Sequence, residues 1–256
     1  MRVLVTRPEN ESRHWVEELR RRGFDAQALP LITIAPVAGA AAIEAAWQQL
    51  DRCRAVMFVS GNAVRHFFGR RPEGAQWPAQ TRAWSPGAGT REALLAAGVD
   101  AKLLDAPPPQ AAQFDSETLW QQVASQVAGG DRVLIVRGGD AQGASSGRDW
   151  LAEQLAAAGA QVQVLVAYQR QPPRLDEGQL AQAKQSHGPD GCVWLFSSSQ
   201  AITHLQGLLP GQDWAKARAV ATHPRIAQAA RKAGFGVVCE SRPSLDAVVA
   251  ALESFR

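Results

Sequence analysis

Residues 58–67 read Phe-Val-Ser-Gly-Asn-Ala-Val-Arg-His-Phe, and residues 196–205 read Phe-Ser-Ser-Ser-Gln-Ala-Ile-Thr-His-Leu. In both stretches an apolar strand ends in a hydroxyl, an amide follows two residues later, and apolar residues then recur at helical spacing. A small-residue turn, a helix and a glycine recur around 87–98 and 222–234. Repetition at this distance predicts two similar domains. A hydroxyl beside the free N–H groups of a helix start is also an anion site.

The bulk composition favours a two-domain protein with a small anionic ligand. The chain has 256 residues, 46% of them hydrophobic, and a formal net charge of +3. This length allows two cores of roughly 100 to 150 residues each. The basic residues are spread along the chain, which argues against nucleic acid as a partner. Apolar runs fall short of the ~20 residues that span a membrane, and the N-terminus lacks a signal-peptide pattern. We therefore expect a cytoplasmic protein without a membrane partner.

Cysteine and histidine give no sign of a metal site. Cys53, Cys192 and Cys239 are odd in number and have no CxxC spacing, so we expect reduced core thiols. The five histidines show no HxxxH or HxH spacing, and we expect them on helix surfaces or at helix ends. The sequence thus predicts no metal site.

Apolar strand-like runs alternate with amphipathic helices along the whole chain, which predicts an α/β fold with parallel sheets and helices on both faces. The expected strands are 2–6, 26–31, 55–60, 82–84, 101–105, 132–136, 192–197, 218–221 and 236–239. The expected helices are 10–22, 61–69, 89–97, 115–127, 147–158, 176–186, 199–208, 223–233 and 244–254.

Two extended segments near 31–37 and 162–173 break this alternation, and each has proline at or next to its end, at 36 and at 172–173. If they pair antiparallel, they form a two-stranded hinge, and one domain is inserted into the other. We then expect a discontinuous domain of 1–33 plus 172–256, linkers at 34–37 and 165–171, and an inserted domain at 38–164. A plain division into an N-terminal and a C-terminal half stays open.

The candidate ligand-binding residues lie where strands end and helices begin, which is where open α/β sheets bind ligands. Serine and threonine hydroxyls there accept or donate to carboxylate or phosphate oxygens, although each also suits an ordinary helix cap. Arginine at a strand end has the fork geometry that carboxylates need. The candidates are Ser60, Thr90, Ser197, Ser198, Thr222, Arg7 and Arg137.

Tyr168 is the single tyrosine of the chain and lies in the proposed hinge. We expect it to overlook any cleft between the domains, where its phenol could donate a proton. No GxSxG, HExxH or DxDxDG motif is present, and 85–90 only loosely approaches a nucleotide-binding glycine loop. The visible machinery therefore suits a reaction that depends on positioning.

The sequence resembles the uroporphyrinogen-III synthase family over nearly its whole length. The resemblance is carried by the order and spacing of Val-Leu-Val-Thr-Arg-Pro at 3–8, Phe-Val-Ser-Gly-Asn-Ala-Val at 58–64, Pro-Gly-Ala-Gly-Thr at 86–90, Asp-Ser-Glu-Thr-Leu at 115–119, Val-Leu-Ile-Val-Arg-Gly at 133–138, the Tyr168 segment and Phe-Ser-Ser at 196–198. Where the family often has a threonine, this chain has Ile226, with Thr222 and Arg225 close by.

This resemblance implies two α/β domains joined by a two-stranded ladder, with an active site in the cleft. The implied substrate is the linear tetrapyrrole hydroxymethylbilane, which carries eight carboxylates, loses its terminal hydroxyl as water and closes with ring D inverted. It implies that Tyr168 assists departure of the hydroxyl and that the hydroxyls at 60, 90, 197 and 198 line the cleft. No cofactor is implied. A transient contact with the enzyme of the preceding step stays open.

Two other readings remain open on the sequence alone. The same elements suit a non-catalytic two-domain protein that closes on a small polyanion, from which the ligand would be recovered unchanged. A nucleotide-dependent transferase is a third alternative, which the loose glycine pattern disfavours.

Overall fold

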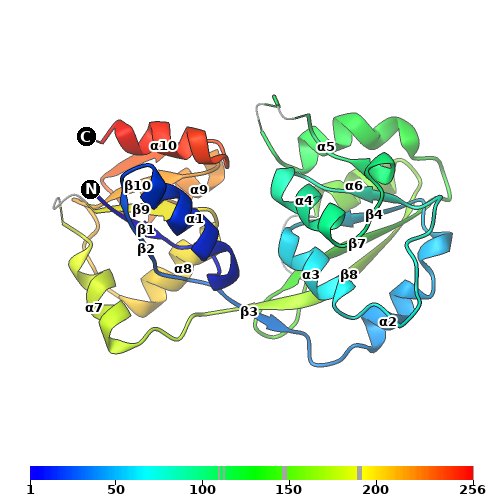
Figure 1. Ribbon diagram of the computed structural model, residues 1–256, viewed down its shortest axis with the longest axis horizontal. Coiled ribbons are helices and arrows are strands. Elements are labelled where there is room, and N and C mark those ends of the chain that lie inside the picture. Colours follow the sequence, from blue (N-terminus) through cyan, green and yellow to red (C-terminus); the bar gives the residue numbers. More distant parts are fainter. Residues whose placement is uncertain (109, 112, 146–148, 189–191, 256) are drawn as a thin grey trace. The chain divides into compact units, whose positions relative to one another are not determined.

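The computed structural model describes residues 1–108, 110–111, 113–145, 149–188 and 192–255. The chain divides into two compact units (Figure 1). Unit 1 comprises Met1–Thr33 with Gln171–Arg256, and unit 2 comprises Ile34–Arg170. Apart from β3 at the edge of unit 2, the strands of each sheet are parallel, and helices flank them, which confirms the predicted α/β class.

Unit 1 joins the two ends of the chain in one sheet with the strand order β11-β10-β9-β1-β2. Its elements are β1 (Arg2–Val5), α1 (Glu9–Arg21), β2 (Asp25–Ala28), α7 (Glu177–Gln185), β9 (Cys192–Phe196), α8 (Ser199–Leu208), β10 (Arg218–Ala221), α9 (Pro224–Lys232), β11 (Val237–Glu240) and α10 (Leu245–Glu253). Val3 of β1 pairs with Val193 of β9. The N-terminal strand is therefore held between β2 and β9, in a sheet that the C-terminal segment completes.

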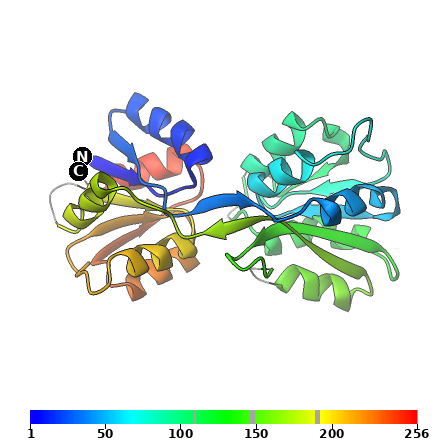
Figure 2. The ribbon, with the colours of Figure 1, turned by 90° about the horizontal axis from the view of Figure 1, so that it is seen from below.

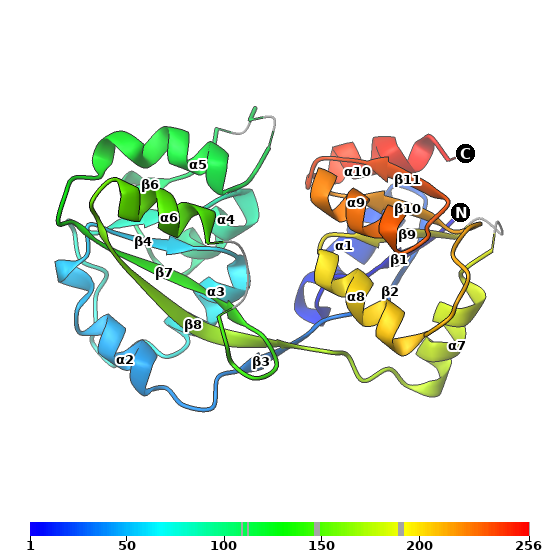
Figure 3. The ribbon, with the colours of Figure 1, turned by 180° about the vertical axis from the view of Figure 1, so that it is seen from behind.

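Helices cover both faces of the unit 1 sheet. Val5 and Leu195 face α1 and α10 in one hydrophobic cluster that also holds Leu19 and Leu252. On the other face, Trp194 stacks on Phe196 with ring centroids 5.9 Å apart. Because successive side chains of a strand point to opposite faces, these strands must be apolar throughout. Figure 3 shows α8 and α9 in front of this sheet and α1 behind it.

Unit 2 has the strand order β3-β8-β7-β4-β5-β6. Its elements are β3 (Thr33–Pro36), α2 (Ala41–Trp47), β4 (Ala55–Phe58), α3 (Gly61–Phe68), β5 (Arg82–Trp84), α4 (Ala88–Ala96), β6 (Leu104–Asp105), α5 (Ser116–Val123), β7 (Arg132–Gly139), α6 (Trp150–Ala157) and β8 (Gln161–Gln171). Short 3-10 turns lie at Leu50–Arg52, Ala101–Leu103 and Ala124–Gln126.

Strand β4 shows why this sheet lies between two layers of helices. Val56 and Phe58 belong to a cluster that includes residues of α2, α3 and α4. Ala55 and Met57 belong to a second cluster with residues of α5 and α6. All four side chains are buried, so each face of the strand contributes to a different core. Figure 3 shows α5 and α6 on one side of the unit 2 sheet and α2 and α3 on the other.

Each sheet has one place where the direction of strand addition reverses. In unit 2 the chain adds β5 and β6 on one side of β4, and β7 and β8 on the other side. In unit 1 it adds β2 on one side of β1, and β9 to β11 on the other. Ligands of open α/β sheets bind beyond the carboxyl ends of the strands at such a switch point. The expected binding places are therefore the ends of β4 and β7 in unit 2 and of β1 and β9 in unit 1.

Most residues of the two segments predicted as linkers, 34–37 and 165–171, lie in strands of the unit 2 sheet. Strand β8 begins at Gln161 and pairs in parallel with β7 as far as Gln169. Strand β3 is hydrogen-bonded to β8. Figure 2 shows β3, in blue, beside the end of β8 and running in the opposite direction. The hydrogen bonds to β7 are the physical reason why 165–170 is part of unit 2.

Three local predictions differ from the structure. Helix α2 was not predicted, since it is short and its N-cap residue Ala40 makes no side-chain cap. The strand predicted at 101–105 is mostly a 3-10 turn, which the Asp100 carboxylate starts by accepting a hydrogen bond from the Lys102 N–H. The helix predicted at 147–158 is described from Trp150 as α6, and residues 147 and 148 lie outside the described residues.

Candidate active site

The hydroxyl of Tyr168 joins side chains from two strands of unit 2. Tyr168 Oη lies 3.0 Å from Ser60 Oγ. It also accepts from Arg170, at 3.0 Å from Nη2 and 3.3 Å from Nε. Ser60 follows β4 and caps α3, where its Oγ accepts from the Ala63 N–H at 3.2 Å. The cluster therefore lies at the end of β4, beside the switch point of the sheet.

A bulge in strand β8 sets the direction of the Tyr168 side chain. Val166 pairs with Arg137 of β7, but the next pair joins Tyr168 with Gly138, so Ala167 is skipped. As a result, the neighbours Ala167 and Tyr168 both contribute to the same hydrophobic cluster. In a regular strand they would face opposite sides. A bulge of this kind aims a side chain differently from its neighbours, a common device beside active sites.

The Tyr168 side chain is buried within unit 2, with an exposed fraction of 1%. Its ring stacks on His66 with centroids 5.6 Å apart and planes inclined by 28°. A methyl group at position 138 would lie 2.6 Å from Tyr168 Cζ, so only glycine leaves room for the ring. The bulge therefore turns the ring into the core of unit 2, and the expectation that Tyr168 overlooks a cleft between the domains stays a prediction.

Ser60 and Thr90 are at the same edge of the unit 2 sheet. They follow β4 and β5, which are parallel neighbours. Thr90 is buried in the first turn of α4. A methyl group at Gly61 would lie 3.7 Å from the Gly89 carbonyl oxygen, so the first turns of α3 and α4 lie close together. The two hydroxyls are thus held beside two neighbouring helix N-termini, where anions are favoured.

The unit 1 candidates occupy the corresponding edge of their own sheet. Ser197 and Ser198 follow β9 and are half-buried, and Ser198 Oγ accepts from the Gln200 N–H at 3.2 Å as the cap of α8. Thr222 follows β10 and is buried, with its N–H donating to the Phe196 carbonyl at 3.1 Å. Ser197, Ser198 and Thr222 thus lie at the carboxyl edge of adjacent strands.

The start of α9 differs from the family pattern in a specific way. Ile226 is buried, so it packs inward and offers no donor. His223 caps the helix, with Nδ1 accepting from the Arg225 N–H at 3.1 Å. Arg225 is exposed. The polar groups at this helix start are therefore Thr222, His223 and Arg225.

Each candidate arginine is paired with a carboxylate of its own unit. Arg7 contacts Glu11 at 3.2 Å and lies 4.4 Å above the centroid of the Trp15 ring. Burial lowers the pKa of Arg7, and the attraction of Glu11 opposes that shift. Arg137 is buried and contacts Asp149 at 2.6 Å. A substrate carboxylate at either arginine would have to share it with this partner.

Three residues of the cluster were missed or misjudged from the sequence. Arg170 was not singled out, although its place two residues after Tyr168 on an extended strand puts both side chains on one face. The expectation that His66 lies on a helix surface is wrong, because it is half-buried against Tyr168. Gly138 had no assigned role, since its partner across the strands depends on the register of β8.

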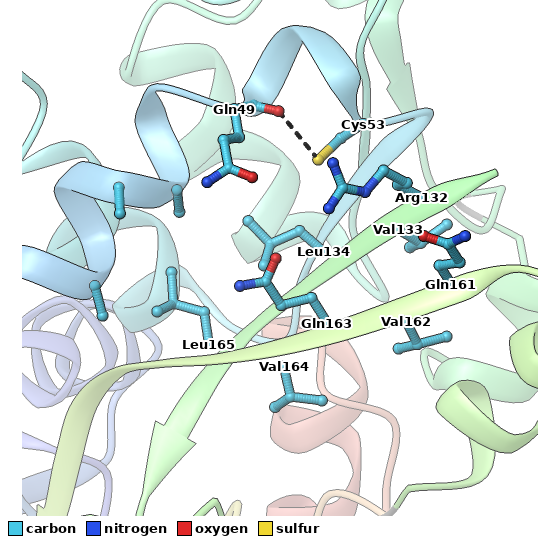
Figure 4. A pocket seen from close by; sticks show the side chains of 13 residues that line it. Gln49, Cys53, Arg132, Val133, Leu134, Gln161, Val162, Gln163, Val164 and Leu165 are labelled. Carbon is cyan, nitrogen blue, oxygen red and sulfur yellow. Dashed lines mark hydrogen bonds between the residues drawn. The ribbon is translucent and has the colours of Figure 1, made fainter. Parts of the chain in front are cut away.

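Figure 4 shows a groove of about 570 Å³ between α2 and the strands β7 and β8. Its lining includes Cys53 and Arg132 but none of the candidate site residues. Burial raises the pKa of the Cys53 thiol, which donates to the Gln49 carbonyl. The three cysteines are free, but only Cys192 is buried as expected of a core thiol, and Cys53 and Cys239 are half-buried. Because its pKa is raised, the Cys53 thiol in the groove stays protonated at neutral pH and is not a reactive thiolate.

Across the described parts of the chain, no group of three or more His, Cys, Asp or Glu side chains is arranged to hold a metal ion. None of the helices in those parts is both long and apolar enough to cross a membrane.

His66 gives the unit a predicted dependence of stability on pH. Burial, and then the positive charges of Arg65 and Arg70, lower the pKa of His66 below its ordinary value of 6.5. At a pH between the lowered pKa of the folded protein and the ordinary pKa of the unfolded chain, His66 binds a proton only in the unfolded chain. Protonation therefore stabilises the unfolded chain in this pH range. We expect the stability from His66 to be full above pH 6.5 and to decrease as the pH falls below it.

The measurement is the urea midpoint of the wild type and of His66→Phe at pH 7.5 and pH 5.5. The phenyl ring keeps the stacking on Tyr168 but cannot bind a proton, so the variant should lose less stability at pH 5.5 than the wild type. His14→Phe, at an exposed position of α1, is the matched control. Equal losses in the wild type and His66→Phe would contradict this prediction.

Comparison of structures supports the fold. The crystal structure of uroporphyrinogen-III synthetase from Helicobacter pylori aligns with a TM-score of 0.59 at 14% identity and covers all of both chains. That of a mutant uroporphyrinogen III synthase from the extremely thermophilic bacterium Thermus thermophilus aligns with a TM-score of 0.58 at 15% identity, covering 100% of this chain and 97% of the other. At such identities the likeness shows the fold alone.

Sequence comparison gives the family. The chain is 29% identical over 212 residues to uroporphyrinogen-III synthase of Chlorobaculum parvum, covering 80% of this chain and 78% of the relative. It is 28% identical over 242 residues to the enzyme of that name from Salmonella typhimurium, covering 92% of each. The family model described as uroporphyrinogen-III synthase HemD matches residues 13–250. Because this match spans nearly the whole chain, the protein belongs to the uroporphyrinogen-III synthase family.

Proposed function

We propose that this enzyme closes hydroxymethylbilane to uroporphyrinogen III, with loss of water and inversion of ring D, in tetrapyrrole biosynthesis. The single observation that supports this function best, beside the family match, is the cluster of Tyr168, Ser60 and Arg170 at the switch point of the unit 2 sheet. A phenol that is hydrogen-bonded to a second hydroxyl can supply the proton that a departing hydroxyl needs. No base is placed in the cluster to activate Ser60 as a nucleophile, and the proposed reaction does not require a covalent intermediate with the enzyme.

The remaining work of the proposed reaction is positioning. Loss of the hydroxyl is driven by the electron-rich pyrrole ring, so the protein needs to stabilise the folded arrangement in which ring D attacks through its substituted carbon. Interactions that are stronger in this arrangement than in the extended substrate increase the rate. Rigid hydroxyl and N–H groups at strand ends suit this task, because strands and helix starts hold them at fixed positions.

We propose that the carboxylates of the substrate bind at the strand ends of both units. In unit 2 the proposed contacts are Ser60, Thr90 and Arg137, and in unit 1 they are Arg7, Ser197, Ser198 and Thr222. Helix N-termini attract anions through their free N–H groups and the helix dipole. The net charge of +3 adds a mild general attraction for a substrate with eight carboxylates.

We further propose that β3 and β8 act as a two-stranded hinge between a discontinuous domain and an inserted one. The chain passes from unit 1 to unit 2 near Thr33 and returns near Gln171, at the ends of these two strands. Few residues then need to change their backbone angles for one unit to move. The enzyme is proposed to act in the cytoplasm.

The test is a product analysis with freshly prepared hydroxymethylbilane, which closes by itself to the type I isomer. The purified protein should yield the type III isomer, faster than the spontaneous reaction yields type I. If only type I forms, at the spontaneous rate, the proposed function is wrong. Recovery of unchanged substrate bound to the protein would instead favour a binding protein that closes on a polyanion.

A further inference from the structure

The hydrogen bonds of the Tyr168 cluster have a defined direction. A guanidinium group can only donate, so both contacts of Arg170 are hydrogen bonds that Tyr168 Oη accepts. The phenol has one proton of its own, and it cannot be directed at Arg170. Ser60 Oγ, 3.0 Å away, is the acceptor that this proton reaches. The pair is therefore ordered, with Tyr168 as the donor and Ser60 as the acceptor.

The proton of Ser60 also has a defined direction. Its Oγ accepts from Tyr168 and from the Ala63 N–H at 3.2 Å, which uses both lone pairs of the hydroxyl. The proton of Ser60 is then free to point away from the cluster. Ser60 is half-buried, whereas Tyr168 is 1% exposed. Of the two hydroxyls, Ser60 is the one that a bound molecule can reach.

We propose that Ser60 delivers the proton to the departing hydroxyl, that Tyr168 resupplies Ser60, and that Arg170 is a positioning residue that fixes this direction. This inference rests on the proposed function and deepens it. It replaces direct contact between Tyr168 and the substrate, which the burial of the phenol opposes. It also replaces the contact of Ser60 with a substrate carboxylate proposed above, because the single proton of Ser60 is directed at the departing hydroxyl.

The step balances without a further reactant. The carbon–oxygen bond of the substrate breaks with both electrons going to oxygen, which takes the Ser60 proton and leaves as water. Ser60 Oγ takes the proton of Tyr168. The resulting phenolate keeps the two hydrogen bonds from Arg170, which are stronger to a charged acceptor than to a neutral one. When ring D attacks the cation, the closed ring loses one proton, which returns to Tyr168 through Ser60.

The surroundings of the phenol support a role for Arg170 in fixing its direction. The Arg170 guanidinium carbon lies 5.6 Å from the centroid of the Tyr168 ring, and the ring is also held by stacking on His66. The ring also lies directly against the backbone of Gly138 in β7, so it cannot move closer to that strand. The ring is thus held by packing, and the two donors of Arg170 decide where its proton points.

The test is a double-mutant cycle with full-length protein and hydroxymethylbilane. Arg170→Met should lower kcat about 10- to 100-fold, the loss typical of charge-assisted hydrogen bonds, with little change in KM. In a Tyr168→Phe background the same substitution should change kcat less than about twofold, because the group that Arg170 directs is already absent. Arg170→Lys, which keeps a donor, should recover part of the activity. Arg174→Met, an exposed arginine in unit 1, removes the same charge as a control.

Several outcomes would overturn the relay. Equal losses from Arg170→Met in the two backgrounds would show that Arg170 acts without Tyr168. A rise in KM with unchanged kcat would make it a substrate-binding residue. Full activity of Ser60→Ala would remove the middle of the relay. In each of these cases the wild type still makes the type III isomer, so the proposed function stands, whereas a wild type that yields only type I overturns both. Circular dichroism and urea midpoints show which variants fold.

Discussion

Replacing Tyr168 with phenylalanine is expected to lower kcat by about 10²- to 10⁴-fold, the range of general acid catalysis, and to leave residual activity. The substitution removes one oxygen, while the ring keeps its stacking on His66 and its place over Gly138. Arg170 is half-buried, so water can replace the lost hydrogen bonds there. We expect a loss of only about 1 kcal/mol in the free energy of unfolding.

Steady-state kinetics with hydroxymethylbilane, corrected for spontaneous closure, measure this effect. Ser254→Ala is a suitable control, because it removes a hydroxyl that donates to the Ala251 carbonyl at the end of α10. Its kcat should equal that of the wild type. Unchanged kinetics of Tyr168→Phe would remove the phenol from the mechanism, whichever residues bind the substrate.

Replacing Gly138 with alanine is expected to slow the enzyme, because the new methyl group displaces the Tyr168 ring without changing its chemistry. The new methyl group would lie 2.6 Å from Tyr168 Cζ, 2.8 Å from Cε2 and 2.9 Å from Oη. These distances are shorter than any real contact of this kind, so the ring must shift. His66 stacks on the ring and limits that shift, so the phenol should lose its alignment with Ser60 and Arg170.

We expect kcat of Gly138→Ala to fall by at least tenfold, with a loss of about 1 to 3 kcal/mol in stability from overpacking. Kinetics and urea unfolding measure the two effects separately. Gly129→Ala is the matched control, since a methyl group there meets nothing within 4 Å. Wild-type stability together with wild-type kcat in Gly138→Ala would show that the ring moves aside freely and that its position is not critical.

Local sequence patterns were sufficient to predict the α/β class and most of the elements. The apolar run of β4 and the helical spacing after Ser60 depend only on neighbouring residues, and both are read directly. Ser60 and Tyr168 were singled out for the same reason, as a hydroxyl at a strand end and as the single tyrosine. Their contact at 3.0 Å could not be read from the sequence, because it joins strands separated by β7 in the order of the sheet.

The parts that could not be predicted depend on register. Skipping Ala167 in the pairing of β8 with β7 turns Tyr168 into the core and places it over Gly138. This register shift of one residue depends on how β8 pairs with β7, so the sequence of β8 alone does not reveal it. The burial of Tyr168, its stacking on His66 and its contact with Arg170 all follow from that shift.

If the Tyr168 cluster carries the chemistry of an enzyme that makes the type III isomer, removing the phenol must slow formation of that isomer. The decisive measurement is a single-turnover reaction of wild type and Tyr168→Phe with hydroxymethylbilane, with the isomers separated. We expect the type III isomer from both proteins, with formation slowed about 10²- to 10⁴-fold in the variant. Only type I from the wild type, or equal rates of type III formation in the two proteins, would contradict it.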